Sequence, residues 1–315
     1  MGTTDPTNIS WPAGKRFAFT VFDDTDRTTL VNGPPVYEFL HEQGFHTTKS
    51  VWPVKGERTP LIGGTTCKDQ DYLLWVQKLR EQGFEIALHN VTYHTSTRVE
   101  IVGGLAQFKT FFGSYPAVHV NHEACRDAVY WGDARLSGAN KLLYNFFTRF
   151  RKHGVFQGHV ANSDVFWGDV LREKIRYVRN FVYSDVNTLR ACPYMPYFDP
   201  DRPYVNNWFA SSEGADVHSF NKTISERNQE TLEEEGGACI MYTHFGKAFF
   251  QDGSLHPTFK RLMERLSRRS GWFVPVSTLL DHIIRVRGQY SISALERYKL
   301  ELKWLINRMM LGGTR

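Results

Sequence analysis

Long apolar runs, paired cysteines and a leader-like N-terminus are all missing from this chain. No run reaches the roughly 18 apolar residues that a membrane-spanning helix needs. The first residues lack the basic start and apolar stretch of a secretory signal. The four cysteines, Cys67, Cys125, Cys192 and Cys239, are scattered and show neither disulfide nor metal-ligand spacing. These absences predict a protein without membrane spans that resides in the reducing cytoplasm.

A strong excess of charge of one sign is also absent. The chain has 38 Lys and Arg against 33 Asp and Glu, a net charge of +5, and it carries no nucleic-acid-binding motif. We therefore expect no nucleic-acid partner. With 315 residues, of which 41% are hydrophobic, the chain is long enough for one large α/β domain or two small ones.

Short apolar segments alternate along the chain with longer amphipathic ones. This alternation predicts a parallel sheet or a barrel, and it makes residues 187–215 a long loop. We expect a lead-in over residues 1–14, one domain over 15–288 and an amphipathic C-terminal helix within 289–315. The predicted strands are 16–22, 47–54, 84–88, 117–121, 174–183, 238–243 and 272–275. The predicted helices are 35–44, 69–82, 96–113, 136–150, 221–235, 257–269, 276–287 and 293–310.

Polar side chains capable of chemistry follow three of the predicted strands. Asp23 and Asp24 end the first strand, His89 follows the strand 84–88, and His244 follows the strand 238–243. His94 lies five positions after His89. Because active sites of barrels and open α/β sheets form at the carboxyl ends of strands, we expect these side chains to meet.

One carboxylate and two imidazoles form a ligand set suited to Zn²⁺ or another divalent cation. Such a site activates water and polarises a carbonyl, a second carboxylate can serve as base, and a further histidine can protonate the leaving group. Each residue also has a structural explanation. The acidic pair could form a turn, the histidines could be hydrogen-bonded core residues, and Asp26 could cap a helix or hold Arg27. Their occurrence at equivalent strand ends favours a hydrolase of amides or esters.

The same residues match three motifs of one family. Thr20-Val-Phe-Asp-Asp24 resembles a strand ending in Thr-Phe-Asp-Asp, and Gly83, Glu85, Ile86 and His89 match a Gly-x-Glu-Ile-x-x-His strand. Met241-Tyr-Thr-His244 is similar to a late Leu-x-His motif. The chain therefore resembles the polysaccharide deacetylases of carbohydrate esterase family 4. The resemblance implies that Asp23 is the base, that Asp24, His89 and His94 bind the metal, and that His244 is the acid.

This resemblance also implies an α/β fold, a distorted, incomplete (β/α)7-type barrel, and removal of acetyl from an N- or O-acetylated sugar. We expect a carbohydrate substrate in surface-polysaccharide metabolism. Two features depart from the family: four residues separate His89 and His94 where the family has three, and no Arg-x-Pro segment that would hold the base is evident. The candidate substrate-binding residues are Asn121, His122, Tyr130, Trp131 and Asp185, with Trp167 and Trp208 as further aromatic candidates.

Two other functions remain open. The altered histidine spacing fits a glycan-binding protein with a degenerate site, whereas the retention of Asp23 and His244 argues for catalysis. A barrel hydrolase acting on small non-sugar amides is the second alternative. The amphipathic C-terminal helix packs either on its own domain or against a second copy of the chain, in a homo-oligomer.

Overall fold

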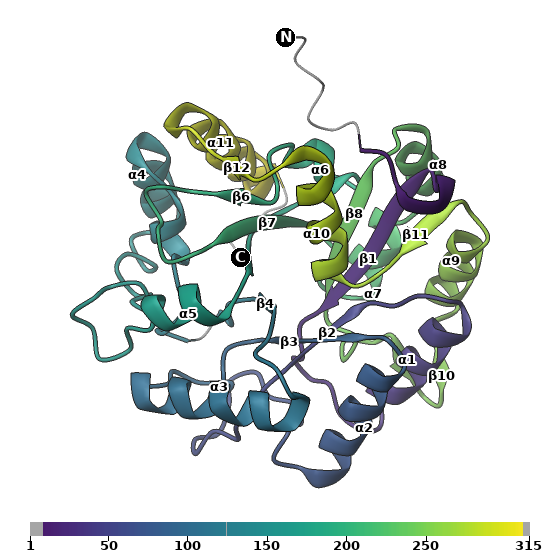
Figure 1. Ribbon diagram of the computed structural model, residues 1–315, viewed down its shortest axis with the longest axis horizontal. Helices are drawn as coiled ribbons and strands as arrows, with labels where there is room; N and C mark the ends of the chain where they lie inside the picture. The colour runs from purple at the N-terminus through teal and green to yellow at the C-terminus, as the bar shows by residue number, and fades with distance from the viewer. Residues whose placement is uncertain (1–8, 124, 311–315) are drawn as a thin grey trace.

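Seven parallel strands form a closed ring at the centre of the molecule. The computed structural model describes residues 9–123 and 125–310. The strands of the ring are β1 (Phe17–Asp23), β2 (Thr48–Val51), β3 (Glu85–Leu88), β4 (Val118–His119), β5 (Tyr177–Tyr183), β7 (Asn207–Ser212) and β8 (Ala238–Thr243). They pair in this order, and β8 pairs back onto β1. The predicted α/β barrel is confirmed (Figure 1).

The ring is irregular because several of its pairings are short. Strand β3 meets β4 at one position, and so does β7 with β8. One edge of β1 is shared: its first residues pair with β11 (Gly271–Phe273), and its last two pair with β2. Two short strands, β6 (Tyr197–Phe198) and β12 (Tyr290–Ser291), extend the sheet beyond β7. The barrel is therefore distorted, as the resemblance implied.

Helices surround the strands on the outside (Figure 1). Good capping explains several of their ends: Thr97 and Glu100 form a capping box at the start of α3, and Gly113 ends that helix in the left-handed conformation. The helices are α1 (Gly33–Glu42), α2 (Gln70–Glu81), α3 (Arg98–Phe112), α4 (Gly138–Phe147), α5 (Gly168–Lys174), α6 (Thr188–Ala191), α7 (Val217–Thr223), α8 (Glu226–Glu234), α9 (Pro257–Ser267), α10 (Val276–Arg287) and α11 (Ala294–Met310). Two turns of 3-10 helix, η1 (Pro12–Gly14) and η2 (Gly132–Arg135), and a hairpin of β9 (Phe250–Gln251) and β10 (Ser254–Leu255) complete the fold.

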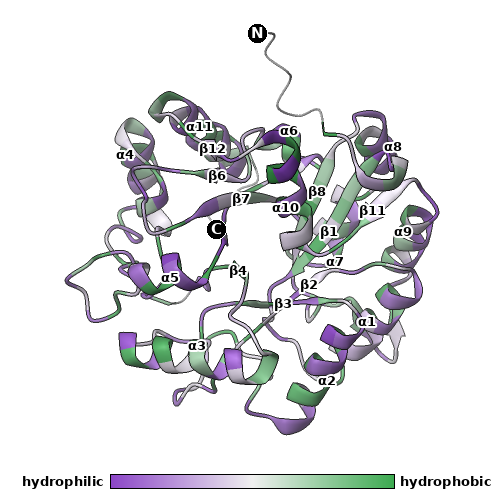
Figure 2. Cartoon of the chain, viewed as in Figure 1, coloured by the Kyte–Doolittle hydropathy of each residue, from purple (hydrophilic) through white to green (hydrophobic). Residues whose placement is uncertain are grey.

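The core lies between the ring and the helices. Every residue of β1 is buried, because one face of this strand points into the barrel and the other packs under helices. Figure 2 shows the resulting apolar colour along β1 and β8, in contrast to the polar outer surfaces of the helices. None of the described helices combines the length and the apolar character that a membrane crossing requires.

Two expectations about secondary structure are wrong. The segment 187–215, predicted as a loop, contains α6, β6 and the ring strand β7. Strand β7 was missed because only its middle residues are apolar, although all of them are buried. The helix predicted over 221–235 is two helices, α7 and α8, and Asp216 forms the cap that begins α7 earlier than predicted.

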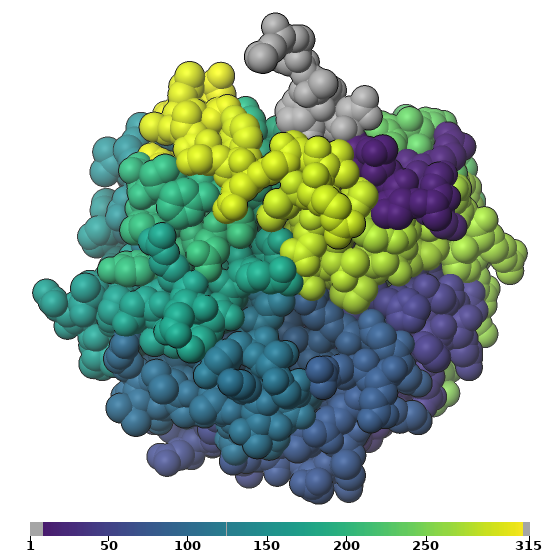
Figure 3. Space-filling model, in the orientation of Figure 1, coloured from purple at the N-terminus to yellow at the C-terminus, as the bar shows by residue number. Residues whose placement is uncertain are grey.

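The first described residues pack against α10, and in Figure 3 the purple N-terminal segment borders yellow C-terminal atoms. Trp11 is buried and lies against His282 of α10, with ring centroids 5.7 Å apart, and His282 Nε2 lies 2.8 Å from the carbonyl oxygen of Ser10. This part of the expected lead-in is therefore packed on the domain, while residues 1–8 lie outside the described chain.

Helix α11 packs on its own chain, as one of the two expected arrangements has it. Its apolar face contacts α4 and β5, and it buries Leu300, Trp304 and Leu305. Glu301 on the same face is fully buried, accepts hydrogen bonds from Ser137 and pairs with Arg202 at 3.0 Å. Association of two copies through this helix stays a prediction.

Replacement of Trp304 by alanine tests the packing of α11. We expect Trp304→Ala to lower the free energy of unfolding by about 3–5 kcal/mol, because a large buried side chain is lost and a cavity is left. Leu295→Ala, on an exposed side of the same helix, should change it by less than about 0.5 kcal/mol. Urea unfolding followed by circular dichroism measures both values. Equal stabilities of the two variants would show that α11 does not pack as described.

Candidate active site

Four strands deliver functional side chains to one end of the barrel. Asp24 and Asp26 follow β1, His89 follows β3, His122 follows β4 and His244 follows β8. Because these strands are parallel, their carboxyl ends meet at the same end of the ring. A pocket of about 840 Å³ opens there and is lined by all five of these side chains. The side chains at the strand ends therefore do converge, but Asp26 and His122 are in the group, whereas the expected Asp23 and His94 are not.

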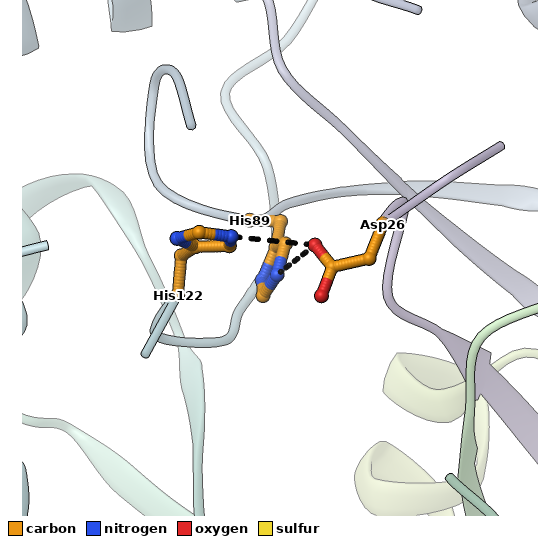
Figure 4. Close-up of side chains that lie close together, drawn as sticks. All are labelled: Asp26, His89 and His122. Atoms are coloured by element: carbon orange, nitrogen blue, oxygen red, sulfur yellow. Dashed lines mark ion pairs between the residues drawn. The ribbon is translucent and has the colours of Figure 1, made fainter. Parts of the chain in front are cut away.

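The Asp26 carboxylate lies at the centre of a group of imidazoles. Its Oδ1 atom is 3.3 Å from His89 Nε2 and 3.4 Å from His122 Nε2, as Figure 4 shows. Its Oδ2 atom is 3.2 Å from His244 Nε2. All four side chains are almost completely buried. Burial alone would raise the pKa of Asp26, but the imidazoles of His122, His244 and His89 outweigh it and hold the pKa well below its usual value.

Asp26, His89 and His122 are suited to hold a metal ion. Within the described residues they form the one group of three ligand-type side chains whose ligand atoms all lie within 4.8 Å of one another. Asp26 Oδ1, His89 Nε2 and His122 Nε2 are all buried, and none of them makes a hydrogen bond. Buried polar atoms without partners are costly, and a cation between these three atoms would satisfy them together.

The rings are held so that their Nε2 atoms face the carboxylate. His89 Nδ1 lies 3.3 Å from the carbonyl oxygen of Val120 and can donate to it, so Nε2 is the nitrogen available to a metal ion. A lone pair that faces a carboxylate oxygen requires a cation or a proton between them. His122 Nδ1 lies 3.4 Å from Cys125 Sγ, and the backbone N–H of His122 donates to Asn90 Oδ1. The same nitrogen pattern as at metal sites is therefore present in both rings.

Asp24 lies beside this group but is bound differently from the metal ligand that was expected. Its two carboxylate oxygens accept hydrogen bonds from the Arg179 guanidinium at 2.9 and 2.6 Å. Burial would raise the pKa of Asp24, but the charge and hydrogen bonds of Arg179, together with His89 and His244, outweigh burial and lower it. Asp24 is thus an ionised carboxylate that lines the pocket and has a fixed orientation. Arg179 lies within β5 and holds the Asp24 carboxylate. The sequence showed no Arg-x-Pro segment that could make such a contact.

Asp23, the expected base, points away from the pocket into the packed layer around β1. Its Oδ1 accepts a hydrogen bond from the backbone N–H of Phe245, and its Oδ2 accepts one from the Tyr37 hydroxyl and lies 3.1 Å from Lys49 Nζ. Asp23 is fully buried and does not line the pocket. Its contact with Phe245, the residue after His244, makes it a positioning residue for that histidine.

His94, the expected second imidazole ligand, also lies outside the group. Its Nε2 accepts a hydrogen bond from the backbone N–H of Glu57, and its Nδ1 lies 2.9 Å from the carbonyl oxygen of Thr95. The loop after His89 turns at once, because Asn90 adopts the left-handed conformation with φ 53°. The four-residue spacing therefore carries His94 to the 55–57 segment, and His122 of the neighbouring strand occupies the place beside His89.

His244 reaches the group from the opposite side of the ring. Its Nδ1 lies 2.7 Å from the carbonyl oxygen of Ala215 and 3.1 Å from Lys247 Nζ, and its Nε2 is directed at Asp26 Oδ2 and the pocket. This is the location that the sequence resemblance implied for it, at the end of β8.

Some of the expected substrate-binding residues line the pocket, and others lie elsewhere. Trp131 and Asn121 line the pocket, but the Asn121 amide is occupied by hydrogen bonds with the backbone of Val129. Tyr130 stacks against His159 with ring centroids 4.4 Å apart and does not line the pocket. Asp185 is paired with Arg190 and lies at a second, smaller pocket. Trp167 and Trp208 are core residues, each 1% exposed.

The sequence contains signals for two residues of the site, His122 and Arg179, whose roles there were not predicted. His122 follows a predicted strand end in the same way as His89 does, and neighbouring parallel strands bring such positions together. Arg179 is a charged residue inside an otherwise apolar strand, and such residues are buried only with a partner. Asp26 could not be separated from Asp23 and Asp24 by sequence, because the direction of each side chain depends on how the chain turns after β1.

Comparison with known proteins gives matches in structure and none in sequence. No family of protein sequences and no curated protein matches the chain. A candidate polysaccharide deacetylase from Mycobacterium smegmatis superposes with a TM-score of 0.51 over 92% of this chain and 97% of its own, at 13% identity. A second candidate, from Pseudomonas aeruginosa PAO1, gives 0.51 over 91% and 96%, at 12% identity. The fold is that of the polysaccharide deacetylases.

The deacetylase fold does not by itself fix a reaction. PuuE allantoinase is as similar to this chain, with a TM-score of 0.51 over 91% of this chain and 95% of its own at 12% identity. Since one fold carries different activities, the chemistry has to be argued from the side chains in the pocket.

Calorimetric titration with Zn²⁺ or Co²⁺ tests the histidine assignment. We expect the wild-type protein to bind one ion, and His122→Ala to weaken binding at least about a hundredfold, because one of three protein ligands is lost. His94→Ala is the matched control and should bind as the wild type does, since His94 contacts only the 55–57 segment and its own neighbour. Circular dichroism confirms that both variants are folded. The reverse pattern, with loss in His94→Ala alone, would restore the ligand set expected from sequence.

Proposed function

We propose that this protein is a metal-dependent hydrolase that removes an acyl group, in the first place acetyl, from an N- or O-acylated sugar. Asp26, His89 and His122 would hold the cation, Asp24 would be the base and His244 the acid. The observation that carries the proposal is the set of three buried, unpartnered ligand atoms beside a fixed carboxylate. The deacetylase fold supports it, because the set lies at the strand ends where barrels place their sites.

A divalent cation in this site supplies Lewis-acid activation of water and of the acyl carbonyl. Two imidazole nitrogens and one carboxylate oxygen are a ligand set that suits Zn²⁺, which makes zinc the first candidate. Trp52 packs against the imidazoles of both ligand histidines, with its ring centroid 6.0 Å from that of His89 and 5.6 Å from that of His122. An apolar wall of this kind excludes water from the outer side of the ligands.

Asp24 is placed to take a proton from the attacking water. Arg179 keeps it ionised and fixes the plane of its carboxylate. A base held in one orientation needs no rearrangement before proton transfer. Because Arg179 itself is buried and its charge is matched by Asp24, the pair can persist inside the barrel.

His244 is placed to protonate the departing amine or alcohol. The contact of its Nδ1 with Ala215 orients the ring, and its Nε2, which lies 3.2 Å from Asp26 Oδ2 and 3.4 Å from the Tyr242 hydroxyl, would deliver the proton into the pocket. His244 and Asp24 follow neighbouring strands of the ring, so a bound acyl group can contact both.

The walls of the pocket support a sugar as the substrate. Trp131, Tyr144 and Phe147 supply aromatic surface, whereas Asp216 and Ser219 supply polar atoms. Sugar rings bind to such combinations through their apolar faces and their hydroxyl groups. A volume of about 840 Å³ accommodates a ligand larger than a single small amide.

Hydrolysis of a small cyclic or linear amide is the second candidate. It rests on the equal structural similarity to PuuE allantoinase. Turnover of such amides without turnover of any acylated sugar would select it. A metal-loaded protein that hydrolyses neither class would instead be the glycan-binding alternative.

Acetate release from a panel of N- and O-acetylated sugars tests the role of Asp24. We expect Asp24→Asn to lower kcat by about 10²–10⁴ while the bound metal is retained, because general-base catalysis is lost and the ligands are not touched. Asp164→Asn, at an exposed ion pair with Arg126, is the control and should keep full activity. Full activity of metal-loaded Asp24→Asn would place the base elsewhere. Loss of metal in this variant would make Asp24 a ligand, as the sequence first indicated.

A further inference from the structure

The same pocket contains a buried arginine that the reaction does not use. Arg135, the last residue of η2, lines the pocket and is 2% exposed. Its guanidinium lies between two indoles: the carbon at its centre is 3.5 Å from the ring centroid of Trp131 and 4.8 Å from that of Trp304. Trp304 comes from α11, so the C-terminal helix forms part of this wall.

Arg135 forms no salt bridge among the described residues, although Glu123 lines the same pocket and its charge acts on Arg135 from a greater distance. It makes no ion pair with a carboxylate of residues 9–123 or 125–310, and its buried Nε has no hydrogen-bond partner. The other two arginines that line the pocket are both neutralised, Arg179 by Asp24 and Arg308 by Glu213 at 3.0 Å. An arginine buried to this degree is almost always paired, so its state here is exceptional.

An unpaired guanidinium in such surroundings is unfavourable. Burial lowers the pKa of Arg135 to about 10, against a smaller opposite effect of the Tyr144 hydroxyl, and the group remains charged at neutral pH. Cation–π contacts with two tryptophans stabilise the charge only in part. An anion that enters the pocket would provide the missing charge and accept the unused N–H donors.

We propose that Arg135 binds an oxyanion, a carboxylate or a phosphate, that the substrate carries besides its acyl group. The identity of the acyl-bearing sugar rests on the proposed function, whereas the anion site rests on Arg135 alone. Stacking on Trp131 and Trp304 occupies the faces of the guanidinium, and its N–H groups, which lie in its plane, remain to bind two oxygens of one anion. The substrate class is therefore an acidic acylated sugar.

Binding of three ligands, measured by calorimetry, tests the anion site. The ligands are an N-acetylhexosaminuronic acid, a phosphate monoester of N-acetylhexosamine, and the neutral N-acetylhexosamine. We expect the wild type to bind at least one of the acidic ligands about tenfold or more tightly than the neutral one, because a charge-assisted pair is formed. The preferred acidic ligand identifies the source of the anion as carboxylate or phosphate.

Arg135→Met separates binding from folding. Methionine fills a similar volume without charge, so the variant should lose the preference, keep the affinity for the neutral ligand within about twofold, and keep or raise the Tm. Arg227→Gln, which removes an exposed arginine of α8, is the control and should keep the preference. Equal affinity of the wild type for all three ligands would overturn the proposal. So would Arg135→Met if it weakened all three by the same factor.

The measurement needs no turnover, so it distinguishes the two proposals. A preference for acidic ligands that depends on Arg135, in a protein that releases no acetate, would keep the anion site and reject the deacetylase. Acetate release without any such preference would do the opposite.

Discussion

The charge of the buried Asp26 carboxylate determines which groups must surround it. It is buried, ionised and faced by three imidazole nitrogens, each from a different strand end. Negative charge in such a place demands positive charge close by. At His89 and His244 the Nδ1 atoms lie beside backbone carbonyls, so Nε2 is the nitrogen directed at Asp26. A cation beside His89 would offset the charge of Asp26 and would leave His244 for proton transfer in the proposed reaction.

The acidic residues at the end of β1 and directly after it lie in different surroundings. Asp23 ends the strand facing the outer layer, where Lys49 and Tyr37 neutralise and bind it. Asp24 faces the interior and meets Arg179, since neighbouring residues of a strand point to opposite faces. Asp23 and Asp24 are thus each matched by a basic side chain, whereas Asp26 is faced by imidazoles. Because Asp26 has no lysine or arginine partner, it is the carboxylate of the three that is suited to bind a metal ion, whereas Asp23 and Asp24 are held by other side chains.

Sequence patterns predicted most of the barrel and the end of it that carries the site. The run of residues 17–22 is apolar except for Thr20, so its burial on both faces can be predicted directly from the sequence. Strand β7 could not be read, because Asn207, Ser211 and Ser212 are buried through tertiary contacts that no local pattern encodes. The expected ligand set differs from the residues that the structure brings together for a related reason: the turn at Asn90 directs His94 away, and strand order places His122 beside His89.

Helix α11 covers the buried guanidinium of Arg135 and so forms part of the pocket. Its buried face supplies Trp304 to Arg135, and Arg308 of the same helix pairs with Glu213 at the pocket. A helix present only to complete the core would not need to enclose a guanidinium without a salt bridge, because an apolar side chain packs there at lower cost. The pocket is therefore lined both by Asp26, a carboxylate suited to a cation, and by Arg135, a guanidinium without a salt bridge. If both proposals hold, a ligand that carries an acyl oxygen and an acidic group would be oriented by these two residues together, since the reversed ligand would satisfy neither.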